Sequence, residues 1–191
     1  MTSVEFDPKS TALVLIDLQN GIVARPLAPH SAADIIANSA KLAASLRAKS
    51  GTAVYVRVEL ADVLTLPVDA PTRDPNAPPP PPSASQIVPE SGYQPTDLLI
   101  TKRQWGAFYG TELDQQLRRR RIRTILLGGI ATNFGVESTA RAAFDRGYEL
   151  IFVEDAMSSV TAPAHEFAVK SIFPRMGRVR TMEQVLEALA R

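Results

Sequence analysis

The chain contains no cysteine in its 191 residues. This absence excludes disulfides, thiolate metal ligands and, above all, a cysteine nucleophile. An excess of charge of one sign is also lacking, because 21 lysines and arginines against 20 aspartates and glutamates leave a formal net charge of +1. Such a balance favours neither nucleic acid nor an acidic membrane surface as a partner. No apolar run approaches the roughly 18 residues of a membrane-spanning helix, so we expect no membrane partner.

Length and composition are those of an ordinary globular protein. Hydrophobic residues make up 45% of the chain and charged residues 21%. A chain of this size can bury one core well and is small for two domains. Residues 1–10 are polar and lack a charged-then-apolar signal pattern, so we expect a cytoplasmic protein. We predict a single domain over residues 1–191.

Short apolar runs alternate along the chain with helical patterns. Continuous rather than alternating hydrophobicity is typical of strands that are buried on both faces of a parallel sheet. The order of elements predicts a three-layer α/β/α sandwich with a mainly parallel sheet of about six strands. The predicted strands are residues 11–16, 53–58, 97–101, 124–127, 150–153 and, at an edge, 178–180, and the predicted helices are residues 31–46, 111–120, 136–144, 163–173 and 181–189.

Residues 60–96 interrupt this alternation with most of the 15 prolines of the chain, including five in a row at residues 78–82. Proline fixes φ and has no N–H, so this segment can form neither a central strand nor a helix. We predict a semi-rigid excursion over the domain surface. The alternative is a polyproline II recognition peptide, which would make the protein an interaction module.

Three features stand where predicted strands end. Asp17 and Lys102 each follow an apolar strand directly, and a turn of small residues at 128–135 joins a third strand to a helix. Ligands bind beyond these carboxyl ends in open α/β sheets, and such a turn presents backbone N–H groups to an anion. A carboxylate and an ammonium meeting there keep each other charged, either in a functional site or as a structural ion pair. Gly135 is unusual, because glycine is unfavourable even in the first turn of a helix.

Several nearby side chains are candidates for contacting a small molecule. Gln19 follows the first strand, and Trp105 and Phe108 follow the third. Each could line a pocket, but Gln19 could equally make a structural hydrogen bond and the two aromatic rings could belong to the core. Arg57 ends the second strand, where its guanidinium could meet a substrate carboxylate.

Residues 13–19, 102–113 and 129–136 form three blocks that together resemble the isochorismatase-like hydrolases, often called cysteine hydrolases. The blocks have the order and spacing of that family, and residues 154–156 and His165 extend the match. The resemblance implies a three-layer α/β/α fold, a homo-oligomer and an Asp–Lys–Cys triad. Asp17 and Lys102 match the first two members of the triad, but Gly135 occupies the position of the cysteine. A cis peptide bond between Ile130 and Ala131 is implied as well.

The missing cysteine limits the chemistry that the resemblance allows. Amide hydrolysis through a covalent thioester is implausible without a thiol. The Asp-x-His pattern that binds metal in nicotinamidases is also missing, so we predict neither a metal nor a cofactor. True isochorismatases carry glycine at the same position, and they hydrolyse a vinyl ether with a general acid rather than a nucleophile.

We therefore predict acid–base hydrolysis of a small vinyl ether such as isochorismate. Asp17 would donate the proton, Lys102 would position Asp17 and tune its pKa, and Gly135 would leave room for the pyruvyl group. The alternative is a non-catalytic small-molecule-binding or scaffold protein that retains the pocket. The predicted substrate-binding residues are Gln19, Trp105, Phe108, Ile130, Ala131 and Thr132.

Overall fold

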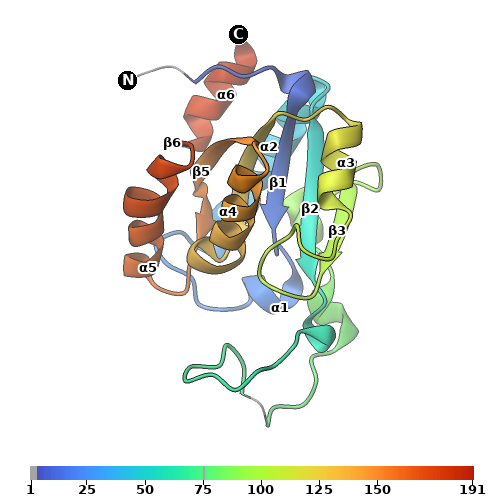
Figure 1. Cartoon of the computed structure of the whole chain (residues 1–191), viewed down its shortest axis with the longest axis vertical. Coiled ribbons are helices and arrows are strands. Elements are labelled where there is room, and N and C mark those ends of the chain that lie inside the picture. The colour runs from blue at the N-terminus through green and yellow to red at the C-terminus, as the bar shows by residue number, and fades with distance from the viewer. Residues whose placement is uncertain (1–3, 75) are drawn as a thin grey trace.

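The protein is built on one sheet of six parallel strands (Figure 1). The computed structural model describes residues 4–74 and 76–191, and the strand order across its sheet is β3-β2-β1-β4-β5-β6. All residues of the two central strands, β1 and β4, are buried, as their continuous apolar sequences predict. The strands are β1 Thr11–Ile16, β2 Thr52–Val58, β3 Leu98–Lys102, β4 Thr124–Ile130, β5 Glu149–Ser158 and β6 Arg178–Arg180.

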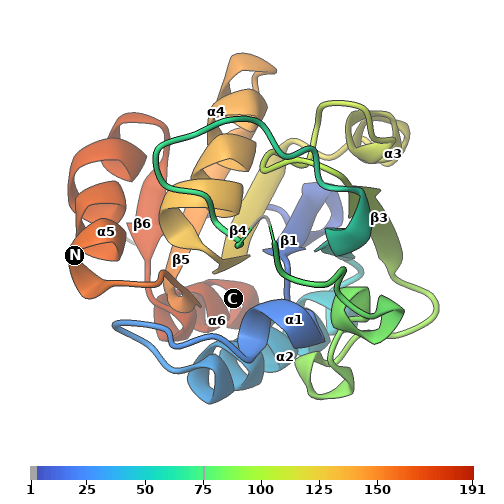
Figure 2. The ribbon, with the colours of Figure 1, turned by 90° about the horizontal axis from the view of Figure 1, so that it is seen from below.

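Helices cover both faces of the sheet, which confirms the predicted three-layer α/β/α sandwich. Figure 2 shows α1, α2 and α6 on one side of the strands and α3, α4 and α5 on the other. One core joins Leu13 and Leu15 of β1 to α2 and α6, and the other joins Val14 and Ile16 to α3 and α4. The helices are α1 Asn20–Val23, α2 Ala32–Ala48, α3 Leu113–Arg119, α4 Glu137–Asp145, α5 Ala162–Phe167 and α6 Met182–Ala190.

Three predicted boundaries are wrong, and tertiary pairing and proline explain them. The strand predicted at residues 124–127 continues as β4 to Ile130, because Gly128 and Gly129 of the predicted turn pair with the end of β1. The strand predicted at residues 150–153 continues to Ser158, because after a bulge Met157 and Ser158 pair with the end of β4. The helix predicted at residues 163–173 ends as α5 at Phe167 and continues as a wide π-type turn, Ala168–Ile172. Pro174, in the 3₁₀ turn that follows, supplies no N–H for a longer helix.

The proline-rich segment leaves the sheet after β2 and returns at β3, beyond the carboxyl ends of the strands (Figure 1). Its second half is tied to the body, because Asn20 N donates to Gln86 O at 3.0 Å and Val88 N donates to Leu18 O at 3.0 Å. Its first half carries exposed apolar side chains such as Leu64, which is 75% exposed. No helix within the described residues is long and apolar enough to cross a membrane.

Candidate active site

Asp17 follows β1 directly at the carboxyl edge of the sheet. Its φ of 55° lies in the left-handed region, which residues other than glycine rarely adopt and which is enriched at functional sites. Its backbone N–H donates to Val56 O at 2.8 Å, and its carbonyl accepts from Gln19 N at 2.8 Å. These two hydrogen bonds fix the backbone of Asp17. The Asp17 side chain is only 9% exposed.

Lys102 is the last residue of β3, and its side chain is 1% exposed. Its Nζ lies 2.9 Å from Asp17 Oδ2 and donates a hydrogen bond to Trp105 O at 2.6 Å. β1 and β3 are both neighbours of β2, so the parallel sheet brings these two strand ends together. The structure thus joins the two residues that the sequence places at strand ends. A buried ion pair of this kind is weak evidence for stability, because desolvation offsets the attraction between the charges.

Gly135 lies directly against this ion pair. A Cβ atom at this position would stand 3.0 Å from Lys102 Nζ, 3.0 Å from Ile16 Cγ2 and 3.3 Å from Asp17 Oδ2. The glycine therefore keeps one side of the Asp17–Lys102 pair clear of a side chain. All three residues of the predicted catalytic set meet at this point of the structure.

The turn that carries Gly135 differs from the predicted one. It is a π-type turn, Thr132–Val136, so Gly135 precedes α4 instead of lying in its first turn. The cause is a hydrogen bond from Val136 N to Ala131 O at 3.2 Å, which spans five residues. Phe134 N donates to the same oxygen at 3.1 Å, so two N–H groups of the turn are engaged within it. The peptide bond between Ile130 and Ala131 is cis, as the family resemblance implied.

Burial raises the pKa of Asp17 from 3.8 to about 6. Desolvation is the largest influence, and the charge and hydrogen bond of Lys102 act against it, followed by the charge of Arg25. Within the described chain, Asp17 Oδ1 is buried and has no partner at hydrogen-bond geometry. The Val58 N–H, which donates to Gln19 Oε1 at 2.8 Å, is close enough to the carboxylate to lower the pKa slightly. Since Oδ2 faces Lys102, a proton placed on Oδ1 leaves the contact with Lys102 in place. The site therefore holds a carboxyl group that can exchange a proton near neutral pH.

Comparisons with known proteins identify the family of the chain. The model of the isochorismatase domain matches residues 11–184. The isochorismatase family protein YecD of Escherichia coli O157:H7 is 44% identical over 198 residues, which cover 97% of this chain and 100% of YecD. The chain belongs to the isochorismatase family.

A solved structure of the same family carries the same fold. The isochorismatase family protein from Burkholderia thailandensis is 44% identical, with a TM-score of 0.92 and full coverage of both chains. A more distant relative is the ureidoacrylate amidohydrolase RutB of Methylorubrum extorquens. It is 39% identical over 98 residues, which cover 51% of this chain and 40% of RutB.

The two aromatic candidates of this isochorismatase-family chain have different surroundings. Trp105 is 53% exposed, and its ring packs edge-to-face on Phe134 of the turn, with 4.9 Å between ring centroids. Because its carbonyl also accepts from Lys102, Trp105 adjoins the site. Phe108 is 4% exposed and belongs to the core, where its ring lies 5.9 Å from that of Tyr148. The structure therefore favours a core role for Phe108 and places Trp105 beside the ion pair.

The three predicted turn residues lie at the end of β4 and the start of the turn. Ile130 is 3% exposed and packs in the core with β1, and Ala131 is half-buried beside it. Thr132 is fully buried, and its Oγ1 lies 2.9 Å from His165 Nδ1 in a hydrogen bond. Burial lowers the pKa of His165 to about 4, with a smaller effect from the charge of His30, so this imidazole is neutral at pH 7. The sequence matched His165 to the family but contained no signal for its contact with the turn.

Gln19 is fully buried, and its side-chain amide bonds to the backbone of other segments. Its Nε2 donates to Val58 O at 2.9 Å and to Ala84 O at 3.2 Å, while its Oε1 accepts from Val58 N at 2.8 Å. Both N–H groups of the amide are therefore used. Gln19 ties the end of β2 to the proline-rich segment, which favours the structural alternative for this residue.

We expect Gln19→Met to lower the free energy of unfolding by about 2 kcal/mol, because it leaves buried backbone groups of Val58 and Ala84 without partners. Urea unfolding followed by circular dichroism measures the change. Gln115→Met, at an exposed position of α3, is the matched control and should change stability by less than about 0.5 kcal/mol. Unchanged stability of Gln19→Met together with weaker ligand binding would instead assign Gln19 to the ligand.

A cavity of about 510 Å³ lies beside the Asp17–Lys102 pair and not over it. Its lining includes Thr101 and Arg103, the neighbours of Lys102 in the chain, but neither member of the pair nor Gly135. Within residues 4–74 and 76–191, no three histidine, aspartate or glutamate side chains are grouped to hold a metal ion.

Proposed function

We propose that this isochorismatase-family hydrolase cleaves a small vinyl ether, such as isochorismate, by general acid catalysis from Asp17. The observation that carries the proposal is a buried carboxyl whose pKa is raised to about 6, with one unpartnered oxygen among the described residues and a glycine beside it. A general acid works best when its pKa lies near the working pH. Gly135 supports the proposal because it places no side chain against the Asp17 carboxyl, where a Cβ atom would stand 3.3 Å from Oδ2.

The proposed reaction balances with water as the only co-reactant. The Asp17 carboxyl gives its proton to the terminal enol carbon, whose π electrons form the new C–H bond. Water adds to the neighbouring carbon, which bears the ether oxygen and has become positive, and releases a proton that restores the acid. The resulting hemiketal breaks its bond to the alcohol and yields pyruvate and the free alcohol. Lys102, held by Asp17 Oδ2 and Trp105 O, fixes the orientation of the carboxyl throughout.

Amide hydrolysis is a second candidate, because RutB, a similar protein over about half of this chain, is an amidohydrolase. The chain has no cysteine, so a covalent thioester is excluded and water would have to attack the amide directly. Asp17 would then act as a general base and would need to be ionised. The two reactions therefore require opposite protonation states of the same carboxyl.

The dependence of the rate on pH separates the two reactions. For vinyl ether hydrolysis we expect kcat/KM for pyruvate release from isochorismate to fall about tenfold per pH unit above pH 6, since the protonated fraction of Asp17 falls. An amidase that uses Asp17 as a base would instead gain activity through pH 6 and reach a plateau above it. Pyruvate is followed by a coupled dehydrogenase assay, and ammonia release from ureidoacrylate and other N-carbamoyl amides is measured in parallel.

The outcomes of this assay are distinct. Pyruvate release with the falling profile supports the proposal, and ammonia release with a rising profile replaces it with amide hydrolysis. If neither product forms although isochorismate binds, the protein is a non-catalytic small-molecule-binding member of the family. Binding is measured by calorimetry on the same preparation.

A further inference from the structure

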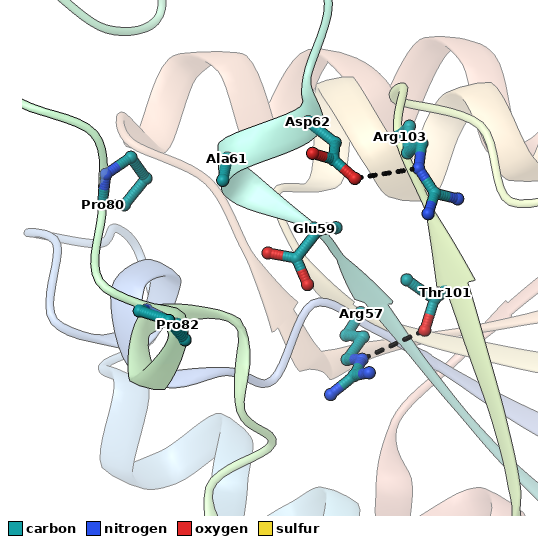
Figure 3. Close-up of a pocket in the computed structure, with 8 residues that line it drawn as sticks. All are labelled: Arg57, Glu59, Ala61, Asp62, Pro80, Pro82, Thr101 and Arg103. Carbon is teal, nitrogen blue, oxygen red and sulfur yellow. Dashed lines mark hydrogen bonds and ion pairs between the residues drawn. The ribbon is translucent and has the colours of Figure 1, made fainter.

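The cavity beside the active site is lined by charged side chains of both signs (Figure 3). β2 contributes Arg57 and is followed by Glu59, while β3 contributes Thr101 and is followed by Arg103. The 3₁₀ turn Leu60–Asp62 and two prolines of the proline-rich segment form the remaining wall. Its volume of about 510 Å³ lies within the range of about 300–1,000 Å³ that is usual for small-molecule sites.

Arg57 presents the positive charge of this cavity. Its Nε donates to Thr101 Oγ1 at 3.0 Å, which fixes the plane of the guanidinium. Within the described chain this is the only hydrogen bond of the Arg57 side chain, so its two terminal nitrogens remain for a ligand. A guanidinium held in this way is suited to a carboxylate, which it can bind through two parallel hydrogen bonds.

Glu59 presents the negative charge. Its Oε1 accepts from Ser85 Oγ at 2.8 Å, and that hydroxyl oxygen accepts from Leu60 N at 3.0 Å. No other donor among the described residues bonds to this carboxylate, which leaves Oε2 for a ligand. Figure 3 shows the Glu59 carboxylate and the Arg57 guanidinium in the same hollow, between the strand ends and the prolines.

The remaining two charges of the cavity neutralise each other at its rim. Arg103 Nε lies 3.2 Å from Asp62 Oδ2, and both side chains are more than half exposed. The lining therefore has no net charge, but it separates a positive from a negative group. A plain anion would meet the Glu59 carboxylate and a plain cation would meet the Arg57 guanidinium, whereas a dipolar ion satisfies both.

We propose that this cavity binds a small amino acid as its zwitterion. The carboxylate of the ligand lies on the Arg57 guanidinium, its ammonium group lies on Glu59, and its carbon skeleton lies against Pro80 and Pro82. The site shares no residue with the Asp17–Lys102–Gly135 cluster, so it is separate from the proposed vinyl ether chemistry. It adjoins that cluster through one backbone hydrogen bond, from Glu59 N to Lys102 O at 2.9 Å.

Calorimetric titration with matched ligands tests the proposal. The probes are L-alanine, L-valine and 4-aminobutyrate, each compared with its N-acetyl derivative, which lacks the cation, and with its amide, which lacks the anion. We expect at least one zwitterion to bind and both of its derivatives to bind at least about tenfold more weakly, because each leaves one charged group of the cavity unpaired. The proposal is overturned if no zwitterion binds with a Kd below about 10 mM, which corresponds to only about 3 kcal/mol of binding free energy, or if the derivatives bind equally well.

Variants assign the two charges to their residues. Glu59→Gln should lose affinity for the zwitterion but not for the N-acetyl derivative, and it can keep the hydrogen bond to Ser85. Arg57→Met should lower the affinity for the zwitterion at least about tenfold. Arg57→Lys should lower it less, because lysine keeps the positive charge but lacks the paired N–H donors of the guanidinium. Arg119→Met, at an exposed position of α3 outside the cavity, is the control for both. If Arg57→Met bound the zwitterion as tightly as the wild type, Arg57 would not be the residue that binds the ligand carboxylate.

The active-site variant Asp17→Asn keeps this test independent of the proposed function. It should bind the zwitterion with the same affinity as the wild type, whatever its effect on turnover. Loss of zwitterion binding in a folded Asp17→Asn variant would show that the ligand sits in the active site and would overturn a separate site.

Discussion

Asp17→Asn is expected to lower kcat/KM for pyruvate release from isochorismate by about 10²- to 10⁴-fold, the usual contribution of a general acid. Asparagine has the shape of aspartic acid but cannot give up a proton, so it removes the chemistry while conserving the volume. The residual activity should also lose the decline above pH 6, because the group that titrates is gone. Initial rates from pH 5 to pH 8 give both readouts.

The control for this variant has to separate catalysis from folding, because the substitution leaves the Lys102 ammonium buried without its carboxylate partner. Thermal melting and circular dichroism establish whether the variant is folded at the assay temperature. Asp145→Asn, at the exposed end of α4, is the matched substitution and should leave the rate unchanged. A folded Asp17→Asn variant with a rate close to that of the wild type is incompatible with Asp17 as the general acid.

The sequence predicts the Asp17–Lys102 contact because topology alone demands it. Parallel strands present their carboxyl ends at one edge of a sheet, so polar residues that directly follow buried apolar strands converge there. The same reasoning predicts the three layers. The position of Gly135 against the pair, in contrast, was predicted only from the resemblance to a family. No local sequence pattern indicates that a Cβ atom at Gly135 would stand 3.0 Å from Lys102 Nζ.

Features that depend on contacts which the local sequence pattern does not encode could not be predicted. The π-type turn, Thr132–Val136, arises from a hydrogen bond across five residues that propensity does not encode. β5 continues to Ser158 only because β4 lies beside it to accept the pairing. Thr132 and His165 are 33 positions apart and meet only in the folded chain. Gln19 looked like a ligand-binding residue because it lies close to Asp17 in the chain, whereas its amide is used by backbone groups 39 and 65 positions away.

The charged cavity also illustrates what a sequence can suggest and what it cannot. Arg57 is predicted at a strand end, where a guanidinium could meet a carboxylate, and the structure places it in a cavity. The opposing Glu59 and the proline wall become part of the same site only because the proline-rich segment folds back over the ends of β2 and β3 (Figure 3). Its loop path is fixed by contacts such as Glu59 to Ser85, 26 positions away.

Lys102→Met is expected to lower the free energy of unfolding by about 3 kcal/mol at pH 8, because it leaves the Asp17 carboxylate buried without its ion-pair partner. The loss should be smaller at pH 5. Lys102 is the main influence that lowers the pKa of Asp17, so its removal raises that pKa further above the unfolded value of 3.8. The folded variant then binds more protons than the unfolded chain, and its stability falls as pH rises through the folded pKa.

In the wild type, the decrease in stability that accompanies ionisation of Asp17 is complete just above pH 6, the folded pKa of this group. In Lys102→Met the decrease continues to higher pH, because the folded pKa of Asp17 is higher there. Urea unfolding of both proteins at pH 5, 6, 7 and 8 measures this difference. The double variant Asp17→Asn with Lys102→Met has no buried carboxylate and should lose the Asp17 contribution to the pH dependence, which closes a double-mutant cycle. His165, whose pKa burial lowers from 6.5 to about 4, makes stability rise with pH in all four proteins alike, so its contribution cancels in the cycle. Lys170→Met breaks an exposed ion pair with Glu166 and should change stability by less than about 1 kcal/mol at every pH. If Lys102→Met lost the same stability at pH 5 and at pH 8, the carboxyl of Asp17 would not be the group that Lys102 keeps ionised, and the proposed tuning of the general acid would be wrong.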